Sequence, residues 1–78
     1  MAAYGSRTGD LNNLVGSGLF YVMSDPAHAP NSAPGEHWYV IQIVCNDDWK
    51  LQIAAGFDGA GVWMRTLSNK RWGAWRQL

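Results

Sequence analysis

The apolar positions of this chain fall into short runs separated by Gly, Pro, Asn and Asp, which is the spacing of β-strands joined by turns. The longest run, 37–45, is built from β-branched and aromatic residues and is interrupted only by Gln42. A strand as apolar as this one would promote aggregation if it lay at the edge of a sheet. We therefore predict that 37–45 is a central strand covered on both faces. The run at 19–24 alternates poorly and is also expected to be covered on both faces.

Three further β elements are predicted towards the C-terminus. In 49–57, Leu51, Ile53 and Ala55 alternate with Lys50, Gln52 and Ala54, which indicates a half-buried strand paired antiparallel with its predecessor. The segment 62–67 alternates in the same way, and 72–78 is expected to be a short final strand or an extended tail. Turn residues separate these segments at 46–48, 58–61 and 68–70.

The N-terminal part carries a different pattern. Asp10 is an N-cap candidate for Leu11, Leu14 and Val15, whose i, i+3, i+4 spacing predicts one or two helical turns. Residues 1–9 are small and polar and are expected to form a flexible lead-in, while three prolines make 25–35 a loop. The predicted fold is thus mainly β, a small antiparallel meander with a short N-terminal helical turn, in one domain spanning 10–78.

Size and composition add an expectation of self-assembly. A chain of 78 residues supports only a small core, and its single cysteine allows no internal disulfide. Hydrophobic residues make up 47% of the chain and charged residues only 15%, with five Trp and a formal net charge of zero. A surface so poor in charge suits a protein that is partly covered by copies of itself.

Several partners and locations are disfavoured by the same composition. Nucleic acid requires a basic stripe, and Lys70, Arg71 and Arg76 make only a weak patch. No run approaches the ~18 apolar residues that span a membrane, and 1–9 has no apolar core of a signal peptide. A free Cys45 agrees with a reducing cytoplasm, and its apolar surroundings predict an inert core thiol.

The ligand-binding candidates are aromatic and turn residues, because loops on a rigid sheet usually carry recognition. They are Trp38, Trp49, Asp47, His28 and His37. Asp47 and Asp48 lack the spacing of an EF-hand and are too close in sequence for a glycosidase pair, so a solvated turn is the simpler interpretation. A metal held by three copies of one histidine on a trimer axis is the weaker alternative. No catalytic residue, metal or cofactor is predicted.

Arg65, Trp72 and Trp75 allow two interpretations. Two indoles three residues apart form either a stacking platform for a sugar or a clamp of the C-terminal segment onto the sheet. Arg65 either binds a sugar carboxylate or phosphate, or stacks on Trp72 or pairs with Asp10. The structural interpretation is favoured for all three residues.

Five short motifs, in order, resemble one domain family. They are Asp10–Leu14 with Gly18–Val22, Ala29–Asn31, Gln52–Ala54, Trp63–Arg65 and Trp72–Arg76. In this order they resemble the pyocin-knob-type domains of phage and R-type pyocin tail fibres, in which Gln52, Trp63, Arg65, Trp72 and Trp75 would be structural motif residues. The chain departs from that pattern at Gly73, where serine is more usual, and in the proline-rich loop.

The resemblance implies a homotrimeric, non-enzymatic element of a virion tail fibre that is made in the host cytoplasm. Its expected partners are neighbouring fibre segments and a bacterial surface glycan or lipopolysaccharide. Two alternatives stay open: a monomeric carbohydrate-binding module of a cell-wall enzyme, and a purely structural trimerisation element.

Overall fold

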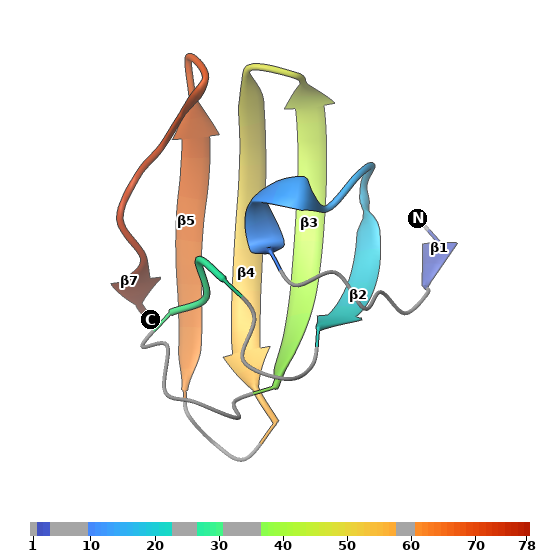
Figure 1. The fold of residues 1–78 in the computed structure, drawn as a ribbon, viewed down its shortest axis with the longest axis vertical. Coiled ribbons are helices and arrows are strands. Elements are labelled where there is room, and N and C mark those ends of the chain that lie inside the picture. The colour runs from blue at the N-terminus through green and yellow to red at the C-terminus, as the bar shows by residue number, and fades with distance from the viewer. Residues whose placement is uncertain (1, 4–9, 23–26, 31–36, 58–60) are drawn as a thin grey trace.

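A computed structural model of the chain describes residues 2–3, 10–22, 27–30, 37–57 and 61–78. It shows one seven-stranded sheet, mainly antiparallel, in which β2, β3, β4 and β5 follow one another as a meander (Figure 1). The prediction of a mainly β fold is confirmed. The strands are β1 (Ala2–Ala3), β2 (Gly18–Val22), β3 (Trp38–Asn46), β4 (Trp49–Gly56), β5 (Val62–Ser68), β6 (Arg71–Trp72) and β7 (Arg76–Gln77).

The two edges of the sheet are short. β1 pairs parallel with β2, so Ala2 and Ala3 of the predicted flexible lead-in add a strand to the sheet. Residues 1 and 4–9 lie outside the described part. At the other edge β6 and β7 both pair antiparallel with β5, which divides the predicted final strand into two pieces.

The hairpin of β3 and β4 is the longest element of the sheet, and its turn lies at Asp47–Asp48, as predicted. The Asn46 side-chain oxygen accepts a hydrogen bond from the Asp48 N–H at 2.8 Å, which is the local bond that makes asparagine favourable in turns. A register shift between Val44 and Asn46 marks a bulge at Cys45. The predicted turn at 68–70 also forms, with positive φ at Asn69 and Lys70.

A 3-10 helix, η1 (Leu11–Asn13), lies over one face of the sheet (Figure 1). Asp10 is its N-cap, and the carboxylate accepts a hydrogen bond from the Asn12 N–H at 2.8 Å. The helical turn predicted from the apolar spacing is therefore present, although it is short. The main core lies between η1 and the sheet and consists of Leu11, Leu14, Phe20, Val22, Ala29, Trp38, Val40 and Ala54.

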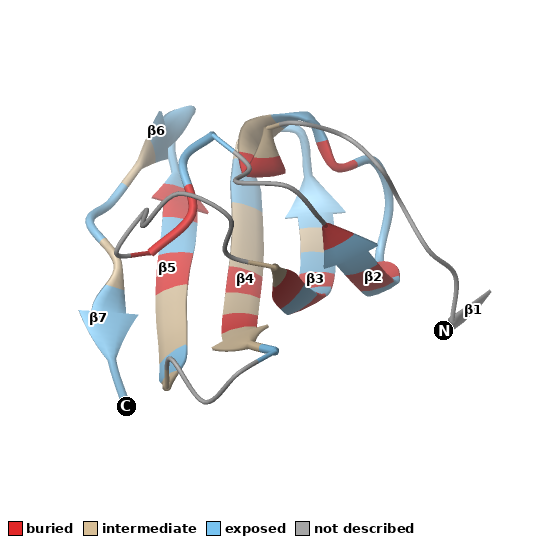
Figure 2. Cartoon of the chain, turned by 60° about the horizontal axis from the view of Figure 1, so that its bottom comes forward, coloured by how far each residue is buried: buried red, intermediate tan, exposed pale blue. Residues whose placement is uncertain are grey.

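Burial alternates strictly along β2 and over the first five residues of β3 (Figure 2). Phe20 and Val40 are buried, whereas their neighbours Tyr21 and Tyr39 are exposed. The prediction that both strands are covered on both faces is thus wrong for the single chain, because η1 and the loop around Ala29 cover one face only.

Two predicted elements fall largely outside the description. Of the proline loop, only 27–30 are described; there Asp10 forms a parallel bridge with Ala27, which ties the loop to the start of η1. In the predicted turn at 58–61, only Gly61 is described, and its carbonyl accepts a hydrogen bond from the Gly56 N–H at 3.2 Å.

Candidate functional site

The covered face of the sheet, which packs against η1, carries a row of buried polar side chains. Gln42, Gln52 and Arg65 are direct neighbours across β3, β4 and β5, and all three are buried. Gln52 Nε2 donates to Gln42 Oε1 at 2.7 Å, and Arg65 Nε donates to Gln52 Oε1 at 2.9 Å. A hydrogen-bonded polar row therefore crosses the middle of the face that would ordinarily be the most apolar.

This polar row fixes η1 to the sheet. Gln52 Nε2 also donates to the Leu11 carbonyl at 2.7 Å, and Gln42 Nε2 donates to the Leu14 carbonyl at 2.9 Å and the Gly16 carbonyl at 3.0 Å. These carbonyls belong to the helix and to the turn that follows it. A 3-10 helix of three residues is too short to persist alone, so these bonds define its place on the sheet.

Arg65 joins the row to the C-terminal segment. Its guanidinium carbon lies 3.9 Å from the centroid of the Trp72 ring and 4.7 Å from that of the Trp75 ring, and Nη2 donates to Asn12 Oδ1 at 2.7 Å. Burial lowers the pKa of Arg65 to about 10, although the charge of Asp10 acts in the opposite direction. The side chain is hence protonated at neutral pH, and it occupies the stacked position on Trp72 that the sequence favoured.

Asp10 and His28 form a second contact between η1 and the loop. The His28 Nδ1 lies 2.7 Å from Asp10 Oδ1, and the His28 carbonyl accepts a hydrogen bond from Trp75 Nε1 at 2.7 Å. Desolvation raises the pKa of Asp10, but the Asn12 N–H, His28 and Arg65 outweigh it, and the net shift is downward. The charged carboxylate is consequently the form that the fold favours.

Replacing Asp10 by Asn should weaken the acid sensitivity of folding. A carboxyl whose pKa is lowered in the folded state adds stability above its unfolded pKa, and that stability is lost as the pH falls through the folded value. Asn is as good an N-cap as Asp, so the expected cost of Asp10→Asn is that of the charge interactions with His28 and Arg65, no more than about 1 kcal/mol at pH 7. The variant should also lose less stability on acidification than the wild type. Urea unfolding of both proteins at pH 7 and below pH 4 measures the two effects. If wild type and Asp10→Asn lose the same free energy of unfolding on acidification, Asp10 is not the carboxyl whose lowered pKa stabilises the fold.

The residues expected to be structural do gather around this network. Gln52, Arg65, Trp72 and Trp75 are in it, and Trp63 and Trp75 pack against the core as partly buried residues. A β-carbon at Gly73 would meet only the Thr66 carbonyl oxygen, at 3.7 Å, so the serine usual in the resembled family would fit there. This side of the sheet is accordingly a structural clamp.

The five predicted ligand-binding residues are not brought together. Trp38 is the clearest correction, because it is fully buried beneath the covered face and is part of the core. Its position in β3 gives it the same orientation as Val40 and Gln42, towards η1. Its indole N–H has no hydrogen-bond partner in the described part of the chain, but the ring is closed to a surface ligand.

The other four candidates are at separate places. His28 is engaged with Asp10 on the covered side, whereas His37 is at the far end of β3 from the turn, its ring centroid 5.5 Å from that of Phe57. Asp47 and Trp49 are both exposed at the tip of the β3–β4 hairpin. Only these last two are neighbours, and the tip is the one predicted contact region that remains.

The sheet surface opposite η1, which we call the open face, was missed by the sequence interpretation. It is the alternate set of side chains on β2 to β5. In the described part it consists of Leu19, Tyr21, Tyr39, Ile41, Ile43, Cys45, Trp49, Leu51, Ile53, Ala55, Val62, Met64, Thr66 and Ser68. This set contains no Asp, Glu, Lys or Arg. Cys45 is exposed at its end, which corrects the prediction of a core thiol.

The open face is large for a chain of this size. Tyr39 is 57% exposed, Ile43 46% and Ile41 38%, and Tyr39 stacks on Phe57 at a ring-centroid distance of 4.1 Å. The exposed fractions of its large side chains correspond to roughly 700–800 Å², beyond the ~300–600 Å² of the largest patch on a typical monomer. This area is close to the ~800 Å² that one partner contributes to a standard protein interface.

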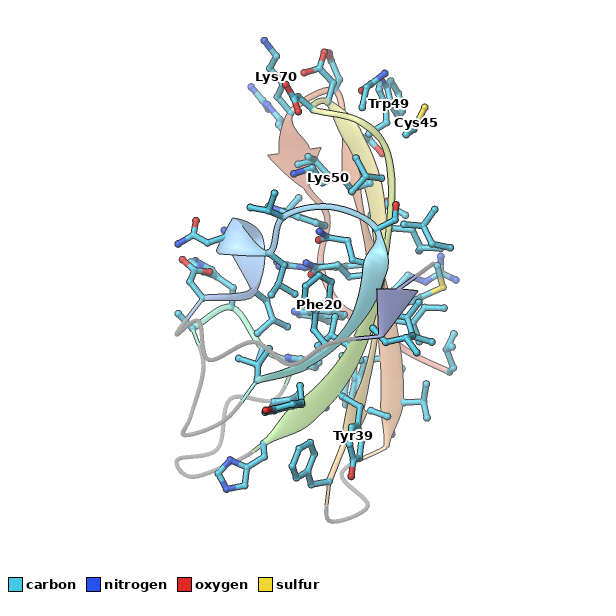
Figure 3. All side chains as sticks on the ribbon, turned by 90° about the vertical axis from the view of Figure 1, so that its right-hand side faces the viewer. Phe20, Tyr39, Cys45, Trp49, Lys50 and Lys70 are labelled. Carbon is cyan, nitrogen blue, oxygen red and sulfur yellow. The ribbon has the colours of Figure 1, made fainter. Side chains whose placement is uncertain are left out.

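A groove of about 260 Å³ lies at the hairpin end of the open face. Its walls are formed by Ile43, Cys45, Trp49, Lys50, Leu51, Thr66, Leu67 and Ser68. Figure 3 shows Cys45 and Trp49 together at this end of the sheet, and Phe20 on the side that η1 covers. Half of the Trp49 surface is exposed, so the groove presents an indole to solvent.

No cluster of three or more potential metal ligands occurs in the described residues. Within the same residues, no helix is long and apolar enough to cross a membrane. No protein-family model, curated protein or solved structure matches this chain.

Proposed function

We propose that this chain is a non-enzymatic module of a phage or R-type pyocin tail fibre, which assembles as a homotrimer and serves attachment to the bacterial surface. The observation that carries the proposal is the uncharged open face. The chain buries Gln42, Gln52 and Arg65 on one side of its sheet and leaves Ile41, Ile43 and Tyr39 uncovered on the other. Sister copies are the occupant that we assign to the uncovered side.

Three properties favour a sister chain over an unrelated partner. The formal net charge of zero means that copies approach without long-range repulsion. The exposed area is that of one side of a standard interface. With no internal disulfide available, a small core also gains stability when its apolar face is covered by association.

The resemblance to pyocin-knob-type domains is the reason for proposing a tail fibre as the assembly to which the chain belongs. Its motifs at 10–14, 52–54, 63–65 and 72–76 contribute Asp10, Gln52, Arg65, Trp72 and Trp75 to the clamp on the covered face. In a fibre, such a clamp would hold the sheet rigid while the open face meets its sisters. The proposed location is the virion tail fibre, with neighbouring fibre segments as further partners.

Sedimentation equilibrium of the chain tests the assembly. We expect a mass of three times 8.6 kDa at concentrations above ~10 μM, and a melting temperature that rises with protein concentration. A monomer whose melting temperature is independent of concentration would contradict the proposal. That outcome would favour the monomeric carbohydrate-binding module, for which the exposed Trp49 is the specific observation.

A further inference from the structure

The exposed apolar side chains of β3 form one stripe along the middle of the open face. Tyr39 is 57% exposed, Ile41 38% and Ile43 46%, and each is two positions from the next along the strand. Cys45 is exposed as well and continues the stripe at the hairpin end. Figure 3 shows Tyr39 and Cys45 at opposite ends of the sheet. The stripe therefore runs along most of the length of β3.

The margins of the open face differ from this middle stripe. On the β5 side, its exposed members towards the hairpin end are Thr66 and Ser68, which are polar. On the other side, β2 contributes only Leu19 and Tyr21, because it pairs with β3 no further than Gln42. Protein interfaces have an apolar centre and a polar rim. By this criterion the centre of the interface between copies lies on β3.

Symmetry restricts how three copies can cover such a stripe. Two sheets that meet face to face with reversed strand directions are related by a two-fold axis, which closes the assembly at two copies. A closed trimer has a three-fold axis instead. When each copy turns its open face towards that axis, all three chains point the same way along it, and each residue of the stripe meets its own counterparts.

We propose that the three-fold axis of the assembly runs along β3, with the three chains parallel and their hairpin ends together. The inference rests on the proposed function, because it specifies how the sister copies of the trimer are arranged. β3 follows the longest dimension of the molecule (Figure 1), so this orientation covers the longest apolar row. It places Ile41 and Ile43 of the three copies around the axis and brings the three Cys45 thiols together at one end.

Cross-linking of Cys45, the only cysteine of the chain, measures this arrangement. A short bis-maleimide should join two Cys45 thiols of each wild-type trimer and leave the third without a partner. The control is Cys45→Ser combined with Val15→Cys, since Val15 is 81% exposed but outside the open face. A thiol held within reach has a high effective concentration, so we expect the wild type to link at least ~10-fold faster than the control. Equal rates overturn the inference.

Two further variants, both made in Cys45→Ser, test the position of the axis. Tyr39→Cys is at the other end of the stripe, whereas Ser68→Cys is on β5, two strands from β3 and therefore roughly 10 Å to its side. An axis along β3 predicts that Tyr39→Cys links within the trimer. Ser68→Cys should not link, because its three copies are then further apart than a short linker spans. Linking of Ser68→Cys without Tyr39→Cys overturns the inference.

Mixed trimers test the direction of the chains. Wild-type chains and tagged Cys45→Ser/Tyr39→Cys chains are unfolded, combined and refolded before the linker is added. Positions 39 and 45 are roughly 20 Å apart along β3, so in parallel chains each thiol links only to its own kind. A covalent product that joins Cys45 of one chain to position 39 of the other shows antiparallel strands and overturns the inference.

The oligomeric mass of every protein is measured by sedimentation, so that the two proposals fail separately. A trimer in which Cys45 links no faster than the control contradicts the axis along β3 and leaves the assembly standing. A dimer that links Cys45 supports the parallel alignment and contradicts the three-fold assembly. A monomer contradicts the proposed function and this arrangement with it.

Discussion

Arg65→Ala should destabilise the domain by about 3 kcal/mol or more, since it breaks a buried hydrogen-bonded network. The substitution removes the donor to Gln52 Oε1 and to Asn12 Oδ1, which leaves two acceptors without their charged partner. It also removes the cation beneath the rings of Trp72 and Trp75. Because a domain of this size has only ~3–5 kcal/mol from its core, much of the protein should be unfolded at 37 °C.

Urea unfolding followed by circular dichroism at fixed protein concentration measures this loss, and two variants serve as controls. Arg71→Ala removes the same side chain from an exposed position and should change stability by no more than ~0.5 kcal/mol. Arg65→Lys keeps the charge but loses the planar guanidinium that stacks and donates in two directions, so an intermediate loss is expected. Equal unfolding curves for Arg65→Ala and Arg71→Ala would show that the buried row does not hold the fold together.

The strands and turns were predictable because their signals are local. A β-branched and aromatic run identified β3, and alternation along the strand identified β4 and β5. Asn46–Asp48 and Ser68–Lys70 identified the turns through residues that bond their own backbone or tolerate positive φ. The N-cap role of Asp10 followed from its place before an apolar i, i+3, i+4 set.

Which face of the sheet is covered was not predictable from the same signals. Alternation along a half-buried strand ordinarily places the apolar Leu51 and Ile53 inside and Gln52 outside. In this chain Gln52 is buried, and Leu51 and Ile53 are only partly buried. The inversion depends on η1 and the turn that follows it, whose carbonyls accept hydrogen bonds from Gln52 and Gln42 across 26 to 41 residues of sequence. Such long-range contacts leave no local pattern in the sequence. Because they decide which face of the sheet is buried, Trp38 was predicted to be a surface residue and Cys45 a core residue, and both predictions were wrong.

One signal for the open face was nevertheless present in the sequence. Gln42, Gln52 and Arg65 are polar residues near the centres of three consecutive strands. Polar residues at matching positions of neighbouring strands indicate a cross-strand row, which needs partners on its own face. When such a row is buried, the apolar residues that precede and follow its members along each strand point to the opposite face, because successive side chains of a strand alternate between faces.

Ile41→Asp should abolish assembly while leaving the fold of the chain intact. Ile41 lies between Leu19 and Ile53 on the open face and is 38% exposed in the single chain. Within an assembly, a carboxylate at this position would be buried without a partner, which costs several kcal/mol at every interface. We expect at least a ~100-fold rise in the concentration needed for trimers, together with loss of the dependence of melting temperature on concentration, as measured by sedimentation and calorimetry.

Val15→Asp is the matched control, because Val15 is also an exposed aliphatic residue, 81% accessible, but follows η1 and is outside the open face. It should assemble like the wild type. Tyr39→Ser, at a more exposed position of the same face, provides a second test if Ile41→Asp weakens β3 itself through the low strand propensity of Asp. If both open-face variants remain trimers, the uncharged surface is not what joins the copies, and the covered face would then be the side to test.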